Sequence, residues 1–269
     1  MFYIARIIKL LYVNRQLLWQ FTLRNVYMEH KGSYLGLIWT IINPILTMLI
    51  FTLIFGYVFN ARYNVIAYET STDFALGIFL SLIVYQLIGD SLAKSPNIIL
   101  SNPNFVKKIV FPLEILAASS VMAMVVNFMF GLTIVIAGAL IFGHGLSLYA
   151  LIFPIIIFPV ILMSLGIAWS LSALGVYIRD ISAFVQILNM ALMYLSAIFY
   201  SVDNLPHRLR FFLKLNPLVH AVEESRNVLL WNMPPEWMGI FYLYLVGIIL
   251  FIAGYACFIA LRPGFADVL

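Results

Sequence analysis

Residue types that perform catalysis are sparse in this chain of 269 residues, and their spacing fits no common active site. The pattern GxxxxGK[ST], whose backbone cradles nucleotide phosphates, does not occur, so the chain is not expected to hydrolyse ATP by itself. The four histidines, His30, His144, His207 and His220, lack the spacing of metal ligands. We therefore expect a chain with no catalytic residue, no metal site and no cofactor of its own.

Asp90 is the carboxylate that lies deepest within an apolar stretch, and Lys94 follows it four residues later. Residues at this spacing share one face of a helix, which favours an ion pair over a proton relay. A series of buried carboxylates, as expected in a proton-coupled transporter, is missing. Asp90 is therefore predicted to pair with Lys94.

Two short motifs have a simple local explanation. Pro112 and Glu114, in the run Phe111-Pro112-Leu113-Glu114, suit the first turn of a helix, where proline has no N–H to lose and a carboxylate faces the positive helix end. Arg179 followed by Asp180 suits an interfacial cation followed by a helix N-cap. Neither motif assigns a function by itself.

The elements that carry these residues are predicted to be membrane-spanning helices. Hydrophobic residues make up 64% of the chain and charged residues 10%, whereas soluble domains have about 25% charged residues. A helix crosses the hydrocarbon core with about 20 residues. Six stretches meet this length, near residues 37–59, 74–94, 112–141, 147–176, 181–200 and 238–261. The predicted fold is an all-α integral membrane protein with six transmembrane helices.

The distribution of Lys and Arg predicts the orientation, because cytoplasmic loops are enriched in both. With the N-terminus inside, the cytoplasmic segments hold Arg6, Lys9, Arg15, Arg24, Lys31, Lys94, Lys107, Lys108, Arg179 and Arg262. The outer segments hold only Arg62, Arg208, Arg210, Lys214 and Arg226. Both termini are therefore expected in the cytoplasm. The scattered basic residues do not indicate nucleic-acid binding.

The first 36 residues are expected to form a separate unit, followed by a six-span domain over 37–269. Polar residues of segment 3–34 occupy about a quarter of the helical wheel, which predicts an amphipathic helix in the cytoplasmic interface. Asn14 and Arg15 interrupt this pattern, so we expect a bend there.

Segment 203–232 is apolar but holds too many charges to span the membrane. Each Arg, Lys or Asp costs about 2.5–3.5 kcal/mol at mid-bilayer. Asn216-Pro217 is expected to divide the segment into two short helices, since proline restricts both residues. We predict a re-entrant helical hairpin at the outer face, with its charged groups reaching water and Glu223 paired with Arg226.

Several motifs occur together in one order. They are Leu23-Arg24-Asn25-Val26, Ser33-Tyr34-Leu35-Gly36-Leu37-Ile38-Trp39, Asn43-Pro44, Asn102 with Lys107-Lys108 and Phe111-Pro112, Arg179-Asp180-Ile181, and Asn216-Pro217. In this order and at these intervals the whole chain resembles the ABC-2 type permeases that export polysaccharides. Asn25 and Glu29-His30 depart from the family pattern, which has Asp and Arg-Tyr there.

The resemblance implies a homodimer that pairs with two copies of a cytosolic ATP-binding subunit, which binds ATP and Mg. It implies export of a polysaccharide linked to undecaprenyl diphosphate across the bacterial inner membrane. O-antigen is the cargo we favour, while capsular and teichoic-type polymers stay open.

The resemblance also assigns roles to residues. Residues 97–110 would be the coupling segment that seats in the ATPase, with Asn102, Pro103, Lys107, Lys108, Phe111, Pro112, Glu114, Arg179 and Asp180 as coupling residues. Trp19, Arg24 and Lys31 would lie where the lipid diphosphate enters. Residues 203–232 would be the outer gate, with Asn216, Pro217, Glu223 and Arg226.

Aromatic residues make up 16% of the chain. Those expected along a sugar path are Phe51, Phe55 and Phe59 on the first span and Tyr194, Phe199 and Tyr200 on the fifth. Rings that pack helices or lie in interfacial belts would look the same. Two other classes stay open at this point: a membrane-embedded glycosyl- or acyltransferase of envelope biosynthesis, and a secondary transporter.

Overall fold

The computed structural model describes residues 2–29, 32, 34, 36–59, 61–66, 69–107, 111–142 and 145–269. All regular elements in these ranges are helices, as predicted. The α-helices are α1 Phe2–Val13, α2 Arg15–Glu29, α3 Trp39–Phe51, α4 Ser71–Lys94, α5 Pro103–Lys107, α6 Glu114–Phe142, α7 Phe153–Tyr177, α8 Ile181–Leu195, α9 His207–Lys214, α10 Pro217–Leu229, α11 Trp237–Leu261 and α12 Phe265–Val268. Shorter helices are η1 Gly36–Ile38, the π-helix η2 Thr52–Val58, η3 Ser95–Asn97, η4 Leu148–Ile152, η5 Val202–Asn204 and η6 Arg262–Gly264.

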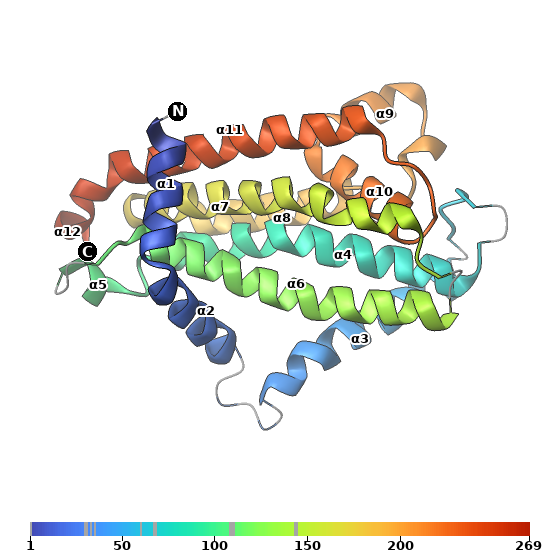
Figure 1. The fold of residues 1–269 in the computed structure, drawn as a ribbon, viewed down its shortest axis with the longest axis horizontal. Coiled ribbons are helices and arrows are strands. Elements are labelled where there is room, and N and C mark those ends of the chain that lie inside the picture. The colour runs from blue at the N-terminus through green and yellow to red at the C-terminus, as the bar shows by residue number, and fades with distance from the viewer. Residues whose placement is uncertain are drawn as a thin grey trace.

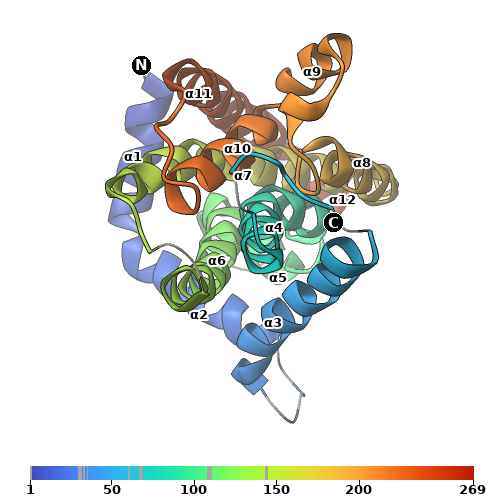
Figure 2. The same ribbon diagram turned by 90° about the vertical axis from the view of Figure 1, so that its right-hand side faces the viewer.

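Helix α4 is the centre of the bundle, and α6, α7, α8 and α10 pack around it (Figure 2). In its most apolar 18-residue window, 89% of the residues are buried. The continuous helix formed by α3 and η2 lies at the periphery. Only 6% of the residues in its most apolar 18-residue stretch are buried. A membrane helix with so little burial has a face that only lipid or another protein chain can cover.

Five of the described helices are long and apolar enough to cross a membrane: 39–58, 71–97, 114–142, 148–177 and 237–268. They correspond to five of the six expected spans. The sixth, expected at 181–200, is the 15-residue helix α8. Its length is about 22 Å at 1.5 Å per residue, shorter than the core of about 30 Å.

Helix α8 ends early because the chain turns sharply at Ala197, whose φ is +54°. The side-chain amide of Asn216 donates to the Leu195 carbonyl at 3.2 Å and to the Ser196 hydroxyl at 3.1 Å. These bonds satisfy acceptors that the end of a helix leaves open.

Helices α7 and α11 make the closest helix pair of the bundle. A Cβ atom added at Gly254 would lie 2.0 Å from the carbonyl oxygen of Gly166, and one added at Gly166 would lie 2.2 Å from that of Leu250. Glycine lets two membrane helices approach to backbone contact. The two helices therefore pack without intervening side chains at this crossing.

Helices α1 and α2 cross one end of the bundle at a steep angle to the long helices (Figure 1). The expected bend is present at Asn14, whose side-chain amide donates to the Leu10 carbonyl at 2.8 Å. Helices α5 and α12 lie at the same end, whereas α9 and α10 lie toward the opposite end (Figure 1). The candidate site residues therefore divide between two ends of one bundle.

Candidate functional site

The expected coupling segment contains the short helix α5, which begins at Pro103 directly after Asn102. Phe105 of α5 packs against Phe111 at 4.8 Å between ring centroids and against Phe21 of α2 at 5.4 Å. Phe21 also contacts Phe111 at 5.2 Å. Three rings thus hold the segment against α2 and leave Lys107 exposed. Lys108, also predicted here, lies outside the described residues.

Arg24 of α2 approaches the same segment. Its guanidinium donates to the Asn102 side-chain oxygen at 3.4 Å and lies over the Phe21 ring at 5.4 Å. Trp19 is exposed one turn earlier, and Lys31 lies outside the described residues. Arg24 also lines a cavity of about 210 Å³ together with Lys94. The structure therefore brings Arg24, expected at the lipid entrance, into contact with Asn102, expected in the coupling segment.

Glu114 begins α6, and Pro112 lies two residues earlier with its carbonyl accepting from the Ile115 N–H at 2.9 Å. The carboxylate of Glu114 is buried and pairs with the Arg262 guanidinium at 2.8 Å. The Trp169 indole donates to the Glu114 carbonyl at 3.1 Å. These contacts join the residue after the coupling segment to the end of α11. Sequence reasoning missed Arg262, because 148 residues separate it from its partner.

Arg179 and Asp180 lie exposed between α7 and α8. A Cβ at Gly175 would collide with the Pro96 carbonyl at 2.1 Å, so this end of α7 lies directly against η3. Asp180 is at the N-cap of α8, as predicted, but its side chain makes no capping hydrogen bond. The structure therefore places the pair at the same end as the coupling segment.

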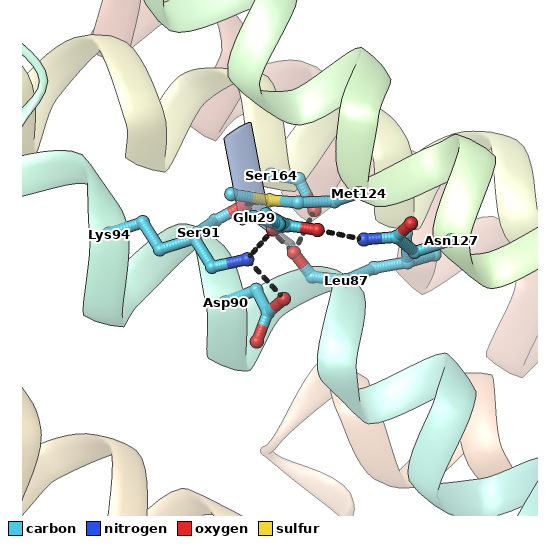
Figure 3. Close-up of polar contacts among 8 residues, drawn as sticks. All are labelled: Glu29, Leu87, Asp90, Ser91, Lys94, Met124, Asn127 and Ser164. Atoms are coloured by element: carbon cyan, nitrogen blue, oxygen red, sulfur yellow. Dashed lines mark hydrogen bonds and ion pairs between the residues drawn. The ribbon is translucent and has the colours of Figure 1, made fainter. Parts of the chain in front are cut away.

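A polar cluster that the sequence analysis found only in part lies where α2, α4 and α6 meet (Figure 3). Lys94 pairs with Asp90 at 3.0 Å, which confirms the predicted ion pair, and also pairs with Glu29 of α2. The second oxygen of Glu29 accepts from the Asn127 amide of α6 at 2.7 Å. Glu29, a departure from the family pattern, therefore links three helices.

The six expected aromatic residues lie together, although they come from two distant parts of the chain. Phe55 stacks on Phe199 with 4.8 Å between centroids, and Phe51 contacts both rings at 5.8 and 5.4 Å. Phe59 and Tyr194 extend the group at 5.7 and 5.9 Å, and the Tyr200 hydroxyl donates to the Tyr194 carbonyl at 2.9 Å. We call this group the aromatic column; it comprises Phe51, Phe55, Phe59, Tyr194, Phe199 and Tyr200.

Segment 203–232 forms two short helices, α9 and α10, divided at Asn216-Pro217 as predicted. The Asn216 side chain caps α10 by accepting from the Leu218 N–H at 3.0 Å. The predicted pairing of Glu223 with Arg226 is wrong. Glu223 instead accepts from the Val202 N–H at 3.0 Å, because η5 packs against this side of α10.

The expectation that the charged groups of this segment reach water is wrong for Arg226, which is fully buried. Its guanidinium donates to the Ser81 hydroxyl at 2.9 Å and to the Ala197 carbonyl at 2.8 Å. It lies 4.3 Å from the Tyr63 ring centroid and 5.3 Å from that of Trp231. Dipoles and aromatic faces, rather than a carboxylate, thus stabilise this charge.

Glu224 is also buried, with 3% of its surface exposed. Burial raises the pKa of its carboxyl to about 7, and the nearby Glu236 and Glu223 carboxylates add to this shift. The Glu236 N–H, which donates to Glu224 at 3.0 Å, acts in the opposite direction. The hairpin therefore carries a group that titrates near neutral pH.

The chain is similar to known proteins over nearly its whole length. The sequence pattern of the family described as ABC-2 type transporter matches residues 16–230. Two Klebsiella pneumoniae proteins named O-antigen export system permease protein RfbA are 28% and 26% identical over 249 residues, which cover 92% of this chain and 93% of each relative. A Myxococcus xanthus protein of the same name is 23% identical over 264 residues, covering 97% and 98%.

Proposed function

This chain belongs to the ABC-2 type transporter family, and we propose that it is the membrane subunit of an exporter for undecaprenyl-diphosphate-linked polysaccharide. The observation that carries the proposal is its full-length similarity to O-antigen export permeases. O-antigen is therefore the proposed cargo. Members of this family are transporter membrane subunits, which separates the chain from the transferase and secondary-transporter alternatives.

The energy source in this proposal is a separate ATP-binding subunit, which the family implies. It binds ATP and Mg, and two copies serve a homodimer of this chain. Helix α5 with the exposed Lys107, at the same end of the bundle as Arg179 and Asp180, is the proposed contact. The ring contact of Phe105 with Phe21 attaches α5 to α2, and the ion pair of Glu114 with Arg262 attaches the start of α6, which follows this segment, to the end of α11. These contacts support the role, because a movement of the segment would be transmitted to several helices.

The polysaccharide path in this proposal follows the aromatic column. Phe59 and Tyr194 are more than half exposed, and the face of α3 around them has little protein cover. Two copies of this face would enclose a path lined by rings. Aromatic faces contact the apolar faces of sugars without fixing a chain at one position, so a polymer can slide.

Helix α8 completes the six spans in this proposal, together with the turn that follows it. The hairpin of α9 and α10 is the proposed outer gate, dipping part-way into the outer leaflet. Phe211, Phe212 and Leu215 on or next to α9 support membrane contact, because each is more than half exposed. The chain lies in the bacterial inner membrane with both termini in the cytoplasm. Cargo moves from cytoplasm to periplasm.

Reconstitution tests the proposal. The chain purified alone should show no ATPase activity, and it should co-purify with the ATP-binding subunit when both are expressed. Lys107→Glu should insert normally but reduce both this association and polysaccharide export, because it reverses the charge of the exposed α5 surface. Lys9→Glu, an equal change at an exposed residue of α1, is the control. Full export by Lys107→Glu would remove α5 from the coupling role.

Orientation is tested separately in a chain whose only native cysteine is replaced, Cys257→Ser. Cysteines placed at Ser71 and Asn104 lie at opposite ends of the bundle. The first should react with an impermeant thiol reagent in intact cells, and the second should react only after the membrane is opened. Labelling of both from outside would contradict the proposed topology.

A further inference from the structure

A polar stripe runs along α4, which is otherwise buried. Gln86 is exposed among buried neighbours, and Asp90 and Lys94 follow at intervals of four residues on the same face. Trp39, Asn43 and Thr47 repeat the same interval on α3. The two stripes line one cavity of about 210 Å³, which Asn127 of α6 and Glu29 of α2 also line.

Polar side chains in the middle of apolar helices such as α3 and α4 need an explanation. Within membrane-spanning helices they almost always face a protein interior or a water-filled cavity, and they often mark a substrate path. The side chains of Asn43, Thr47 and Gln86 have no hydrogen-bond partner among the residues that the structure describes. Their donors and acceptors are therefore available to a molecule in the cavity.

The charged residues of the cavity are held in position by one another. Lys94 lies between Glu29 and Asp90, and Asn127 fixes the second oxygen of Glu29 (Figure 3). One oxygen of Asp90 and the buried oxygen of Asn127 make no hydrogen bond within the described chain. The site thus presents acceptors in fixed positions next to the Trp39 ring.

The sign of the charge selects the kind of ligand. Two carboxylates against one ammonium leave the cavity net negative, which disfavours a phosphate or another anion. Amides, a hydroxyl, carboxylate oxygens and an indole together suit a neutral molecule with many hydroxyl groups, which both donate and accept. The adjoining cavity that Arg24 and Lys94 line has no carboxylate among its lining residues and suits an anion instead.

We propose that the cavity between α3 and α4 binds a neutral sugar unit of the transported glycan, close to the carrier diphosphate at Arg24. The site is separate from the aromatic column. It rests on the proposed function, because the glycan supplies the sugar. Its role is to recognise the sugars nearest the lipid before the polymer enters the path.

Photocrosslinking in cells that make the polysaccharide and contain the ATP-binding subunit tests the site directly. A diazirine-bearing residue replaces Gln86 in one variant, Phe55 in a second and Gln186, an exposed glutamine of α8 outside the cavity, in a third. After illumination, adducts are detected with an antibody against the polysaccharide. The Gln86 and Phe55 variants should yield glycan adducts, and the Gln186 variant should yield few.

Three other results would contradict part of this proposal. Adducts at Phe55 but none at Gln86 would overturn the sugar site and leave the proposed function intact. Phospholipid alone at Gln86 would also overturn it. Absence of glycan at both positions would contradict the proposed function itself.

A substitution pair provides a second measurement in proteoliposomes that hold the full complex. The double variant Gln86→Leu, Thr47→Val removes hydrogen-bonding groups that have no protein partner, so folding should be preserved. Its control, Gln186→Leu, Thr133→Val, makes the same side-chain changes outside the cavity, where the Thr133 hydroxyl donates to the Met129 carbonyl of its own helix at 2.9 Å. Export by the first should fall about tenfold, as expected for two or more lost hydrogen bonds. Equal export by both doubles would overturn the sugar site.

Discussion

Lys94 and Arg226 are cations within the helical bundle that the protein stabilises by opposite means. Lys94 is partly exposed, pairs with two carboxylates and lies beside a cavity. Arg226 is fully buried, and its nearest partners are a hydroxyl, a carbonyl and two aromatic rings. A half-exposed ion pair contributes little to stability because water already solvates both charges. A buried charge without a counter-ion depends on every contact around it.

The comparison assigns different roles to the two ends of the bundle. Around Lys94, contacts can exchange with water at small cost, as a binding site requires. Around Arg226, the contacts tie α10 to α4 and to the turn after α8, so the hairpin and the short helix form one unit. We therefore expect the loss of Arg226 to have a larger effect on stability than the loss of Lys94.

The largest effect is expected from Arg226→Ala. The substitution removes the bonds to Ser81 and the Ala197 carbonyl and leaves a void beside the Tyr63 and Trp231 rings, so the free energy of unfolding should fall by about 3 kcal/mol or more. Thermal unfolding in detergent measures the change. Arg208→Ala, at an exposed arginine of α9, should change stability by less than about 0.5 kcal/mol. Equal melting temperatures of the two variants would show that the buried Arg226 contributes no more to stability than an exposed arginine.

A pH dependence is expected from Glu224, the other buried charge of α10. Its folded-state pKa of about 7 lies above the ordinary value of 4.5. The raised pKa stabilises the fold fully below about pH 4.5. This stabilisation is lost as the pH rises through about 7, and the loss amounts to about 3 kcal/mol. The melting temperature should therefore fall between pH 5 and 8, and Glu224→Gln should remove most of this decrease. A variant with an unchanged pH profile would assign the dependence to another group.

At the other end, Lys94→Met should have a smaller and local effect. Glu29 and Asp90 would then repel each other across the α2–α4 contact, and screening by water limits the cost to about 1 kcal/mol. Amide hydrogen exchange in the last turns of α2 should become about fivefold faster. Lys9→Met on α1 is the control and should leave these rates unchanged. A global loss of protection would show that Lys94 belongs to the core instead.

The smallest effect is expected from Tyr63→Phe. This variant loses the hydroxyl bond to the Ile198 carbonyl but keeps the ring that covers Arg226, so the expected cost is about 1 kcal/mol. Tyr63→Ala removes both features and should cost more, as measured by thermal unfolding. If the two variants are equally destabilised, the hydroxyl rather than the aromatic face stabilises Arg226.

Local patterns in the sequence were sufficient for much of the fold. Apolar length predicted the long helices, the interruption at Asn14 predicted the bend, and Asn216-Pro217 predicted the division of α9 from α10. The ion pair of Asp90 with Lys94 was also predictable, because its partners lie one helical turn apart. Each of these features is determined by residues close together in the chain.

The remaining features depend on residues far apart in the chain. Glu29 meets Lys94 across 65 residues, and Arg226 meets Ser81 across 145. Neither contact leaves a periodic signal. The same holds for the early end of α8, which Asn216 of the hairpin helps to cap. The stripe of Gln86, Asp90 and Lys94 was readable in principle, since its four-residue spacing marks one face of a helix.

The backbone contact of α7 with α11 restricts how this protein can change shape. With Gly166 and Gly254 in contact, neither helix can slide along the other without a collision of main-chain atoms. The α7–α11 pair therefore moves as a rigid body, and other helices move relative to it. In the proposed transporter, a change of shape would come from the long helices with the fewest buried residues, α3 and α8. The aromatic column lies on these two helices and on the segments that follow them, η2 and the turn after α8, so a small rocking motion would change the spacing of its rings directly.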